Sequence, residues 1–189
     1  MNLGGGFGVQ YRNYLAHPML PVEPDDSEEA GLTTVSMLRE LLRVFGQAGC
    51  TLVLQPGRSL LAHAGILLTK VLYRKESGGK TFIVVDAGMN DLLRPSLYRS
   101  YHQIVPIAPR SPATELVDVV GPLCESGDFL AQDRLMPRVD RGDILAVMCA
   151  GAYGFALASN YNARPRPPEV LVDGASHACI RKRETLEDL

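Results

Sequence analysis

The stretch ILLTKVLYRKESGGKTFIVVD, residues 66–86, contains two strand-like runs separated by a turn. Residues 66–73 and 81–86 are rich in β-branched and aromatic side chains, which favour strands. Between them lies SGGK, residues 77–80, whose two glycines supply the positive φ angles that a two-residue hairpin turn requires. The stretch therefore predicts a β-hairpin.

Further short strands are expected downstream of this hairpin. The runs at residues 116–120, 144–149 and 169–172 are short and apolar, with Gly, Pro and Asp between them. Several short strands separated by turn signals, with few helical patterns, are typical of an antiparallel β domain. We therefore expect residues 65–189 to form such a domain, of barrel or sandwich type.

The region before the hairpin has a different pattern. LGGGFG, residues 3–8, indicates the end of a strand that enters a glycine loop. An amphipathic helix is expected over residues 27–47, where apolar residues recur at helical spacing, and a short strand over residues 51–55. Strand, glycine loop, helix and strand is the order of a parallel sheet or barrel. Residues 1–64 are therefore expected to be an incomplete α/β piece.

The composition is that of an ordinary globular chain. Of 189 residues, 46% are hydrophobic and 21% are charged, and the net charge is −2. This charge gives no electrostatic reason to expect nucleic acid or an anionic membrane as a partner. No run approaches the ~18 apolar residues of a membrane span. The first residues lack the basic and apolar regions of a secretion signal, so the cytoplasm is the expected location.

The four cysteines are widely scattered, without a CxxC pair or neighbouring histidines. This pattern argues against a zinc site or a disulfide framework, and no metal is expected. Cys50, Cys149 and Cys179 lie beside apolar residues and are expected to be core thiols. Cys124 has a different setting, between a Gly-Pro pair and the polar residues that follow it.

Two glycine loops are candidates for binding a phosphate. GGG at residues 4–6 and QPGR at residues 55–58 each follow an expected strand. Glycines allow backbone N–H groups to approach an anion closely, and TIM-barrel enzymes commonly bind phosphate in the loops after late strands. A tight turn explains either loop alone. When the two loops are considered together, and one of them carries an arginine, a phosphate-binding site and two ordinary turns explain the sequence equally well.

Side chains capable of binding or catalysis gather in the second half of the chain. RPSLY contains Arg94 and Tyr98, CESGD contains Cys124 and Glu125, and AGAYG contains Tyr153. An arginine can bind a carboxylate with two hydrogen bonds, a glutamate can bind an amine, and a tyrosine hydroxyl can reach a phosphate. Each residue also has an ordinary explanation, as a surface charge or a half-buried ring. The residue types alone do not decide between these explanations.

The motifs are, in order, LGGGFG, QPGRSL, LLTKVLYRKE, DAGMNDLLRPSLY, DVVGPLCESGDFLA, AGAYGFALASNYNARPRPPEVLVDG and RKRETLEDL. Their order and spacing resemble the C-terminal half of diaminopimelate decarboxylases, which are pyridoxal-phosphate-dependent class II Orn/Lys/Arg decarboxylases with an alanine-racemase-like fold. CESGD is typical of the diaminopimelate branch rather than of the ornithine branch. The resemblance implies a multi-domain α+β protein, with part of a pyridoxal 5′-phosphate-binding TIM barrel over residues 1–64 and a C-terminal antiparallel β domain over residues 65–189. It also implies a homodimer with active sites at the interface.

The resemblance implies roles for individual residues. The residues expected to contact the cofactor are Gly4, Gly5, Gly6, Gln55, Gly57, Arg58 and Tyr153. Arg58, Arg94 and Tyr98 would bind the far carboxylate of the substrate, and Glu125 would bind an ammonium group. Cys124 would donate a proton, reaching with Glu125 into the site of the partner subunit. The reaction would convert meso-diaminopimelate to L-lysine and CO₂.

Two departures from the family pattern affect the expected activity. Gln55 occupies the position of a glutamate that keeps the pyridine nitrogen protonated. The lost charge assistance is worth on the order of 1–2 kcal/mol, or roughly ten- to thirtyfold in rate. The family's cofactor-binding lysine lies on an early barrel strand, and none of the lysines Lys70, Lys75, Lys80 and Lys182 matches it. We therefore expect this chain alone to be inactive.

Two functional hypotheses remain. In the first, the chain is one part of a diaminopimelate decarboxylase that becomes active when a barrel half supplies the lysine. In the second, the chain is a non-catalytic module that pairs with an intact decarboxylase, which the departure at Gln55 favours slightly.

Overall fold

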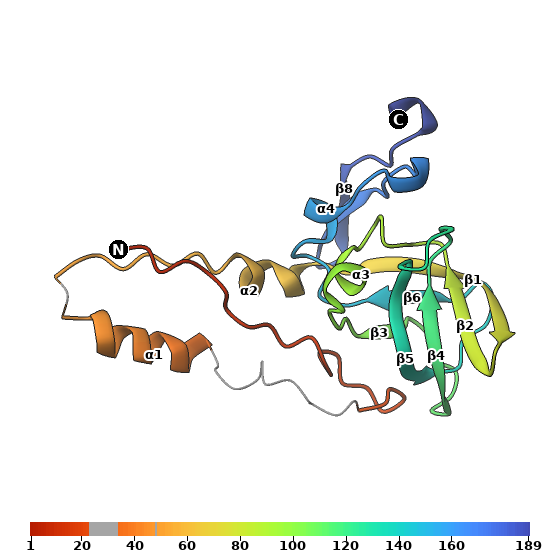
Figure 1. Ribbon diagram of the computed structural model, residues 1–189, viewed down its shortest axis with the longest axis horizontal. Helices are drawn as coiled ribbons and strands as arrows, with labels where there is room; N and C mark the ends of the chain where they lie inside the picture. Colours follow the sequence, from red (N-terminus) through yellow and green to blue (C-terminus); the bar gives the residue numbers. More distant parts are fainter. Residues whose placement is uncertain (23–33, 48) are drawn as a thin grey trace.

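The computed structural model describes residues 1–22, 34–47 and 49–189. A six-stranded sheet forms the largest body of the chain, and the segments around α1 and α2 extend away from it (Figure 1). The helices are α1 (Thr34–Phe45), α2 (Gly57–Leu61), α3 (Arg94–Tyr98) and α4 (Gly154–Leu157), with 3₁₀ turns at Ala62–Ala64, Tyr161–Ala163 and Leu186–Asp188. The strands are β1 (Leu67–Ser77), β2 (Lys80–Val85), β3 (Ile104–Pro106), β4 (Thr114–Val120), β5 (Phe129–Pro137), β6 (Ile144–Val147), β7 (Glu169–Asp173) and β8 (Ser176–Arg181).

The hairpin predicted from residues 66–86 is confirmed. Strands β1 and β2 pair antiparallel, with Ser77 opposite Lys80. Gly78 and Gly79 form the two-residue turn at φ angles of 59° and 77°. Both values lie in the left-handed region that residues with a Cβ rarely adopt, so the two glycines set the register of the hairpin.

The sheet is mixed, and the expectation of an antiparallel domain is wrong at one pair of strands. The strand order is β3-β6-β1-β2-β4-β5, and β2 runs parallel to β4 while the other neighbours are antiparallel. Parallel neighbours require a crossover connection, which here contains α3 and β3. Short strands and turn residues cannot reveal the direction of a connection of this length.

The two outer strands of this sheet, β3 and β5, contact each other, so the sheet is nearly closed. Arg134 on β5 donates from Nη1 to the backbone oxygen of His102, just before β3, at 2.8 Å. The core lies inside this curved sheet. Its fully buried side chains include Val71, Ile83, Val119, Leu130 and Leu145.

The helix expected over residues 27–47 is confirmed from Thr34 to Phe45, while residues 27–33 lie outside the described residues. The strand expected over residues 51–55 is reduced to a single parallel bridge between Asn2 and Val53. Hydrogen bonds continue on both sides of this bridge, and the segment before α1 therefore runs parallel to the segment after it.

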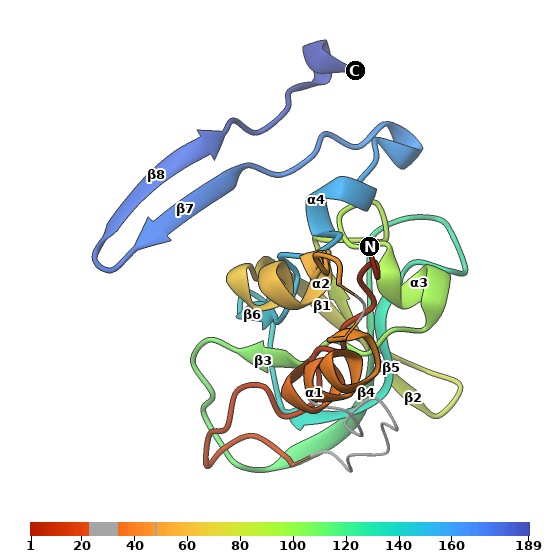
Figure 2. The same cartoon turned by 90° about the vertical axis from the view of Figure 1, so that its left-hand side faces the viewer.

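Strands β7 and β8 form a separate two-stranded hairpin, which lies apart from the six-stranded sheet in Figure 2. Every residue of β8 is exposed. The expected core thiols are therefore corrected in two places, since Cys179 on β8 and Cys50 are exposed and only Cys149 is buried. An apolar neighbour in sequence predicts burial only where a second layer covers the strand.

Within the residues that the structure describes, no helix is both long enough and apolar enough to cross a membrane.

Candidate functional site

The structure brings the two glycine loops together. Leu3 donates its backbone N–H to Val53 at 2.9 Å, and Gln55 donates to the backbone oxygen of Gly4 at 2.8 Å. A Cβ on Gly5 would lie 2.4 Å from the backbone oxygen of Gln55, so only glycine allows this approach. Gly4 and Gly6 have positive φ angles of 75° and 87°. The loops at residues 4–6 and 55–58 thus form one continuous surface.

This glycine surface has room for a phosphate. Added Cβ atoms at Gly4, Gly6 and Gly57 would meet nothing within 4 Å, so the space beside their backbones is open. The side chain of Gln55 is exposed, and Arg58 follows in the first turn of α2. The Gly4 and Gly57 N–H groups donate within the chain, to Asn2 Oδ1 at 2.8 Å and to the Gln55 backbone oxygen at 2.9 Å. The amides of Gly5 and Gly6, with Arg58 nearby, are therefore the groups that fit the phosphate of pyridoxal phosphate.

A buried arginine dominates the second group of candidate residues. Arg94, the first residue of α3, is only 6% exposed. Its Nη1 donates to the Tyr11 hydroxyl at 2.5 Å, and its Nη2 donates to the Ser100 hydroxyl at 3.2 Å. No carboxylate of the described residues forms an ion pair with Arg94. Burying a cation without an anion is costly, which makes Arg94 a candidate for binding one.

The surroundings of Arg94 are aromatic and basic. Its Cζ lies 4.9 Å from the ring centroid of Tyr11 and 5.6 Å from that of Tyr153. A cavity of about 250 Å³ opens beside it, lined by Val9, Tyr11, Arg12, Arg94, Tyr98, Arg99, Ser100 and Tyr101. The structure therefore gathers three of the expected residues, Arg94, Tyr98 and Tyr153. Arg58 does not line this cavity.

His102 packs against Tyr11, one of the residues that line this cavity, and is uncharged near neutral pH. It is fully buried, packs edge-on against the Tyr11 ring at 5.1 Å, and has Nδ1 2.9 Å from the Met148 backbone oxygen. Burial lowers the pKa of His102 to about 4, and the charges of Arg94 and Arg134 act in the same direction. The group next to Tyr11 is thus neutral, and the positive charge is concentrated on the arginines.

The expected catalytic residues Cys124 and Glu125 occupy a loop between β4 and β5. Both side chains are exposed, and neither lines the cavity beside Arg94. Glu125 accepts a hydrogen bond from the Tyr161 hydroxyl at 3.1 Å, which raises the pKa of Tyr161. Ser96 of α3 donates to the Gly127 backbone oxygen at 2.5 Å. Helix α3 and the loop of residues 121–128, called the cysteine loop below, are therefore connected by a hydrogen bond. Cys124 and Glu125 nevertheless do not line the cavity beside Arg94 within this chain.

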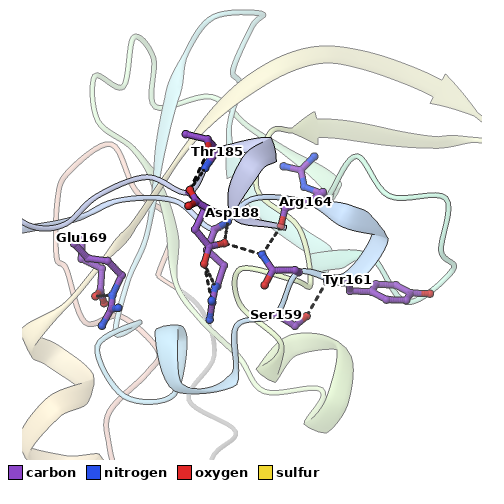
Figure 3. Close-up of polar contacts among 10 residues, drawn as sticks. Ser159, Tyr161, Arg164, Glu169, Thr185 and Asp188 are labelled. Atoms are coloured by element: carbon purple, nitrogen blue, oxygen red, sulfur yellow. Dashed lines mark hydrogen bonds and ion pairs between the residues drawn. The ribbon is translucent and has the colours of Figure 1, made fainter.

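The segment that carries Tyr161 is held by contacts with the C-terminal residues. Asn160 and Arg166 both donate to the Glu184 carboxylate, at 2.7 Å and 2.8 Å. The Arg166 hydrogen bond lowers the pKa of Glu184 to about 2. Figure 3 shows the Tyr161 ring directed away from the polar contacts around Thr185 and Asp188, which leaves its hydroxyl available to Glu125.

Sequence reasoning missed Tyr11, Ser96, Ser100 and Tyr161 as parts of the site. Tyr11, Ser96 and Tyr161 act through contacts with residues in other segments, and no motif marks such a contact. Ser100 contacts Arg94 six residues away, just after the helix that Arg94 begins. The one available signal was the ring of Tyr161 in the quoted ASNYN segment, which has no apolar pattern around it.

Comparison with known proteins identifies the family of this fold. The C-terminal sheet domain of pyridoxal-dependent decarboxylases matches residues 14–151. The chain belongs to this family. The resemblance stated from the motifs is therefore confirmed, and decarboxylases of this family are pyridoxal-dependent.

Several decarboxylases similar to this chain share one name. The diaminopimelate decarboxylases of Aquifex aeolicus and Pseudomonas aeruginosa are each 46% identical to this chain, over 187 and 189 residues. These alignments cover 99% and 100% of the chain but 41% and 42% of the two relatives. The crystal structure of diaminopimelate decarboxylase from Helicobacter pylori, complexed with L-lysine, matches with a TM-score of 0.81 at 39% identity, covering 99% of this chain and 42% of that one. The chain thus spans about two fifths of the length of its relatives.

Proposed function

We propose that this chain is the C-terminal part of a pyridoxal-phosphate-dependent diaminopimelate decarboxylase, which converts meso-2,6-diaminopimelate to L-lysine and CO₂. The observation that carries this proposal is the buried Arg94, which has no carboxylate partner in the described residues and lies beside Tyr98 and Tyr153. A substrate carboxylate supplies the missing anion. The 46% identity to diaminopimelate decarboxylases favours this substrate over other amino acids.

We also propose that residues 1–64 belong to a TIM barrel and residues 65–189 to the β domain. The parallel hydrogen bonds between the segments at residues 1–4 and 51–55, with α1 between them in sequence, support the barrel assignment. The rest of the barrel, with the cofactor-binding lysine that the resemblance implies, would come from the part of the relatives that this chain does not cover. The chain therefore requires this barrel half for activity.

The residues of this chain would contact the cofactor at its phosphate and ring. The loops of Gly4–Gly6 and Gly57, with Arg58, would hold the phosphate in the open space beside them, chiefly through the Gly5 and Gly6 amides. Pyridoxal phosphate, when bound, supplies an electron sink for the bond to the departing carboxylate. Gln55 would contact the ring nitrogen without the charge of a glutamate, and Tyr153, whose ring lies 5.6 Å from Arg94 Cζ, would also contact the cofactor.

The substrate would be oriented by groups at both of its ends. The guanidinium groups of Arg58 and Arg94 and the Tyr98 hydroxyl would bind the far carboxylate, and the Glu125 carboxylate would bind an ammonium group. Cys124 would transfer the proton on its Sγ to the carbon that has lost CO₂. Because Cys124 and Glu125 do not line the Arg94 cavity, they would act in the site of a second subunit of a cytoplasmic homodimer.

The test is reconstitution of activity from two chains. The chain would be mixed with a separately expressed barrel half, pyridoxal phosphate and meso-diaminopimelate, and the release of CO₂ and L-lysine would be measured. Activity is expected in the mixture and in neither half alone. Arg94→Lys should lose most of this activity, whereas Arg138→Lys, at an exposed arginine that does not line this cavity, serves as the control. Silence in a mixture of two folded halves would overturn the proposal.

A second candidate function is a non-catalytic module that pairs with an intact decarboxylase. The observation that favours it is Gln55, which replaces the charged partner of the cofactor ring. Adding the chain in excess to an intact diaminopimelate decarboxylase should then change its activity or its dimer exchange. An unchanged rate and unchanged exchange count against this alternative.

A further inference from the structure

The loop that carries Cys124 and Glu125 is fixed by one buried carboxylate. Asp128, at the end of CESGD, is 4% exposed, whereas Cys124 and Glu125 are exposed to solvent. No ion pair to Asp128 occurs among the described residues. A buried carboxylate without a cation must be stabilised by hydrogen bonds. The residues that donate these hydrogen bonds are therefore the ones whose positions Asp128 fixes.

The donors come from two different loops. Met89 donates its backbone N–H to Oδ1 of Asp128 at 2.6 Å, and Leu123 donates to Oδ2 at 2.6 Å. The backbone of Asp128 closes the same loop. Its oxygen accepts from the Gly121 N–H at 2.9 Å, and its N–H donates to the Glu125 backbone oxygen at 3.0 Å. The carboxylate thus ties the cysteine loop to the loop that precedes α3.

Two glycines make space for this carboxylate. A Cβ on Gly121 would lie 2.3 Å from Oδ2 of Asp128, and a Cβ on Gly88 would lie 2.8 Å from Oδ1. Neither position allows a larger residue unless Asp128 moves. The fit is therefore specific to this side chain in this rotamer, on both of the loops that it joins.

Other contacts attach the far side of the cysteine loop to the same group of segments. Ser96 of α3 donates to Gly127, and Tyr161 donates to Glu125. The Ser159 N–H donates to the Asn90 backbone oxygen at 2.9 Å, which brings the Tyr161 segment to the loop that Asp128 holds. The direction of Glu125 toward Tyr161 consequently depends on where Asp128 anchors the loop.

We propose that Asp128 is a positioning residue for Cys124 and Glu125, and that its carboxylate, shared between the Met89 and Leu123 N–H groups, fixes the loop that presents them. What Cys124 and Glu125 then do rests on the proposed function. An asparagine cannot replace this carboxylate, because its amide has a single oxygen and its NH₂ group would face one of the two N–H donors. That N–H would remain buried without an acceptor, and the loop would shift to expose it to water.

The test uses the full chain with ¹³C-labelled tyrosine, followed by NMR over a pH titration. In the wild type the Glu125 carboxylate raises the pKa of Tyr161. The Glu125→Gln variant shows which titration midpoint Tyr161 has when this contact is lost. Asp128→Asn is expected to lower the Tyr161 midpoint toward that of Glu125→Gln. It should also move the Met89 and Leu123 amide resonances upfield. A folded Asp128→Asn protein with wild-type values for Tyr161 and both amides overturns the proposal.

Asp118→Asn is the matched control. Asp118 on β4 is 6% exposed and also accepts a backbone N–H at 2.6 Å, from Asp133, so its replacement should destabilise the protein comparably. It is expected to leave Tyr161, Met89 and Leu123 unchanged. Equal changes in Tyr161 for both variants would mean general loosening of the protein and would refute a positioning role.

A wild-type measurement keeps the proposal testable if the variant does not fold. Scalar couplings across the hydrogen bonds should connect the Met89 and Leu123 amide nitrogens to the Asp128 carboxyl carbon. The absence of both couplings overturns the proposal. Neither readout depends on decarboxylation, so an intact Asp128 contact in a silent reconstituted mixture would refute the proposed function alone.

Discussion

The Arg94 guanidinium is buried against Tyr11, with Nη1 2.5 Å from the phenol oxygen and Cζ 4.9 Å from the centre of the ring. The two residues lie 83 positions apart in the sequence. Tyr11 follows the glycine loop, and Arg94 begins α3, so this contact joins the expected cofactor-binding segment to the expected substrate-binding helix.

Tyr11→Phe removes the acceptor of a buried cation. Hydrogen bonds to charged groups contribute roughly 1.5–3 kcal/mol, so the free energy of unfolding in urea should fall by about 2 kcal/mol. Tyr14→Phe is the control, because Tyr14 is 39% exposed and its loss should change stability by less than about 0.5 kcal/mol. Equal losses in the two variants would contradict this role of Tyr11.

His102 should make the protein less stable in mild acid. Its pKa is about 4 in the folded protein because of burial, against an ordinary value of 6.5. The unfolded chain therefore binds a proton between these two values that the folded chain does not. The free energy of unfolding should fall by up to about 3 kcal/mol as pH drops through this window, and this contribution should level off below pH ~4.

Urea denaturation at a series of pH values measures this effect. His102→Gln cannot take up the proton and should lack this component of the pH dependence, even if its stability at neutral pH is lower. The same slope in the variant and the wild type would show that other groups cause the acid sensitivity.

Gly5→Ala should separate the two glycine loops. The added methyl group would lie 2.4 Å from the Gln55 backbone oxygen, and backbone atoms on both sides prevent a small adjustment. Hydrogen exchange at the Leu3 and Gln55 amides should accelerate by roughly an order of magnitude or more. Gly57→Ala, where the methyl group meets open space, should leave both rates unchanged.

Glu184→Gln should loosen the C-terminal segment without affecting the six-stranded sheet. The pKa of Glu184 is lowered to about 2 by its hydrogen bond from Arg166, so its contribution is present above pH ~4.5 and is lost as pH falls through the folded-state value. Hydrogen exchange at the Arg166 amide, which also donates to Glu184 at 2.8 Å, should be faster in the variant. Asp173→Asn, at the exposed end of β7, is the control.

Thiol titration should distinguish one cysteine from the other three. Cys50, Cys124 and Cys179 are exposed, whereas Cys149 is buried and burial raises its pKa to about 11. Because the thiolate is the reactive form, a disulfide reagent at neutral pH should label the three exposed thiols quickly and Cys149 only after unfolding. Labelling of Cys149 in the native protein at a similar rate would contradict its burial.

The sequence predicted the parts of the fold that depend on local chemistry. The β1–β2 hairpin followed from Gly78 and Gly79, because the turn requires their φ angles. Strand β5 was missed because Gln132, Asp133 and Arg134 interrupt its apolar pattern, and Asp133 adopts a positive φ of 47° within it. Strand β8 was missed because its residues are exposed on both faces and show no alternation.

The candidate site was likewise predictable only in part from the sequence. The motifs that contain Arg94, Cys124 and Glu125 were recognisable as segments. Their supporting contacts were not, because Tyr11 and Tyr161 approach from segments 83 and 36 residues away. A contact over such a separation is decided by the topology of the chain, and the parallel β2–β4 pair was not predictable from local pattern.

The near closure of the six-stranded sheet has a consequence for self-association. Outer strands with unpaired backbone groups are templates on which another molecule can add a strand. Since β3 and β5 face each other, with the Arg134 side chain spanning the gap to His102, neither outer strand presents a free template to solvent. Among the described strands, β7 and β8 are the ones that can accept an added strand, because their hairpin pairs with no third strand and Val170, Val172 and Ile180 are exposed on it. Substitution of these three residues by Lys or Glu should therefore keep the isolated chain monomeric at high concentration, because charged side chains on an edge strand oppose the addition of another strand.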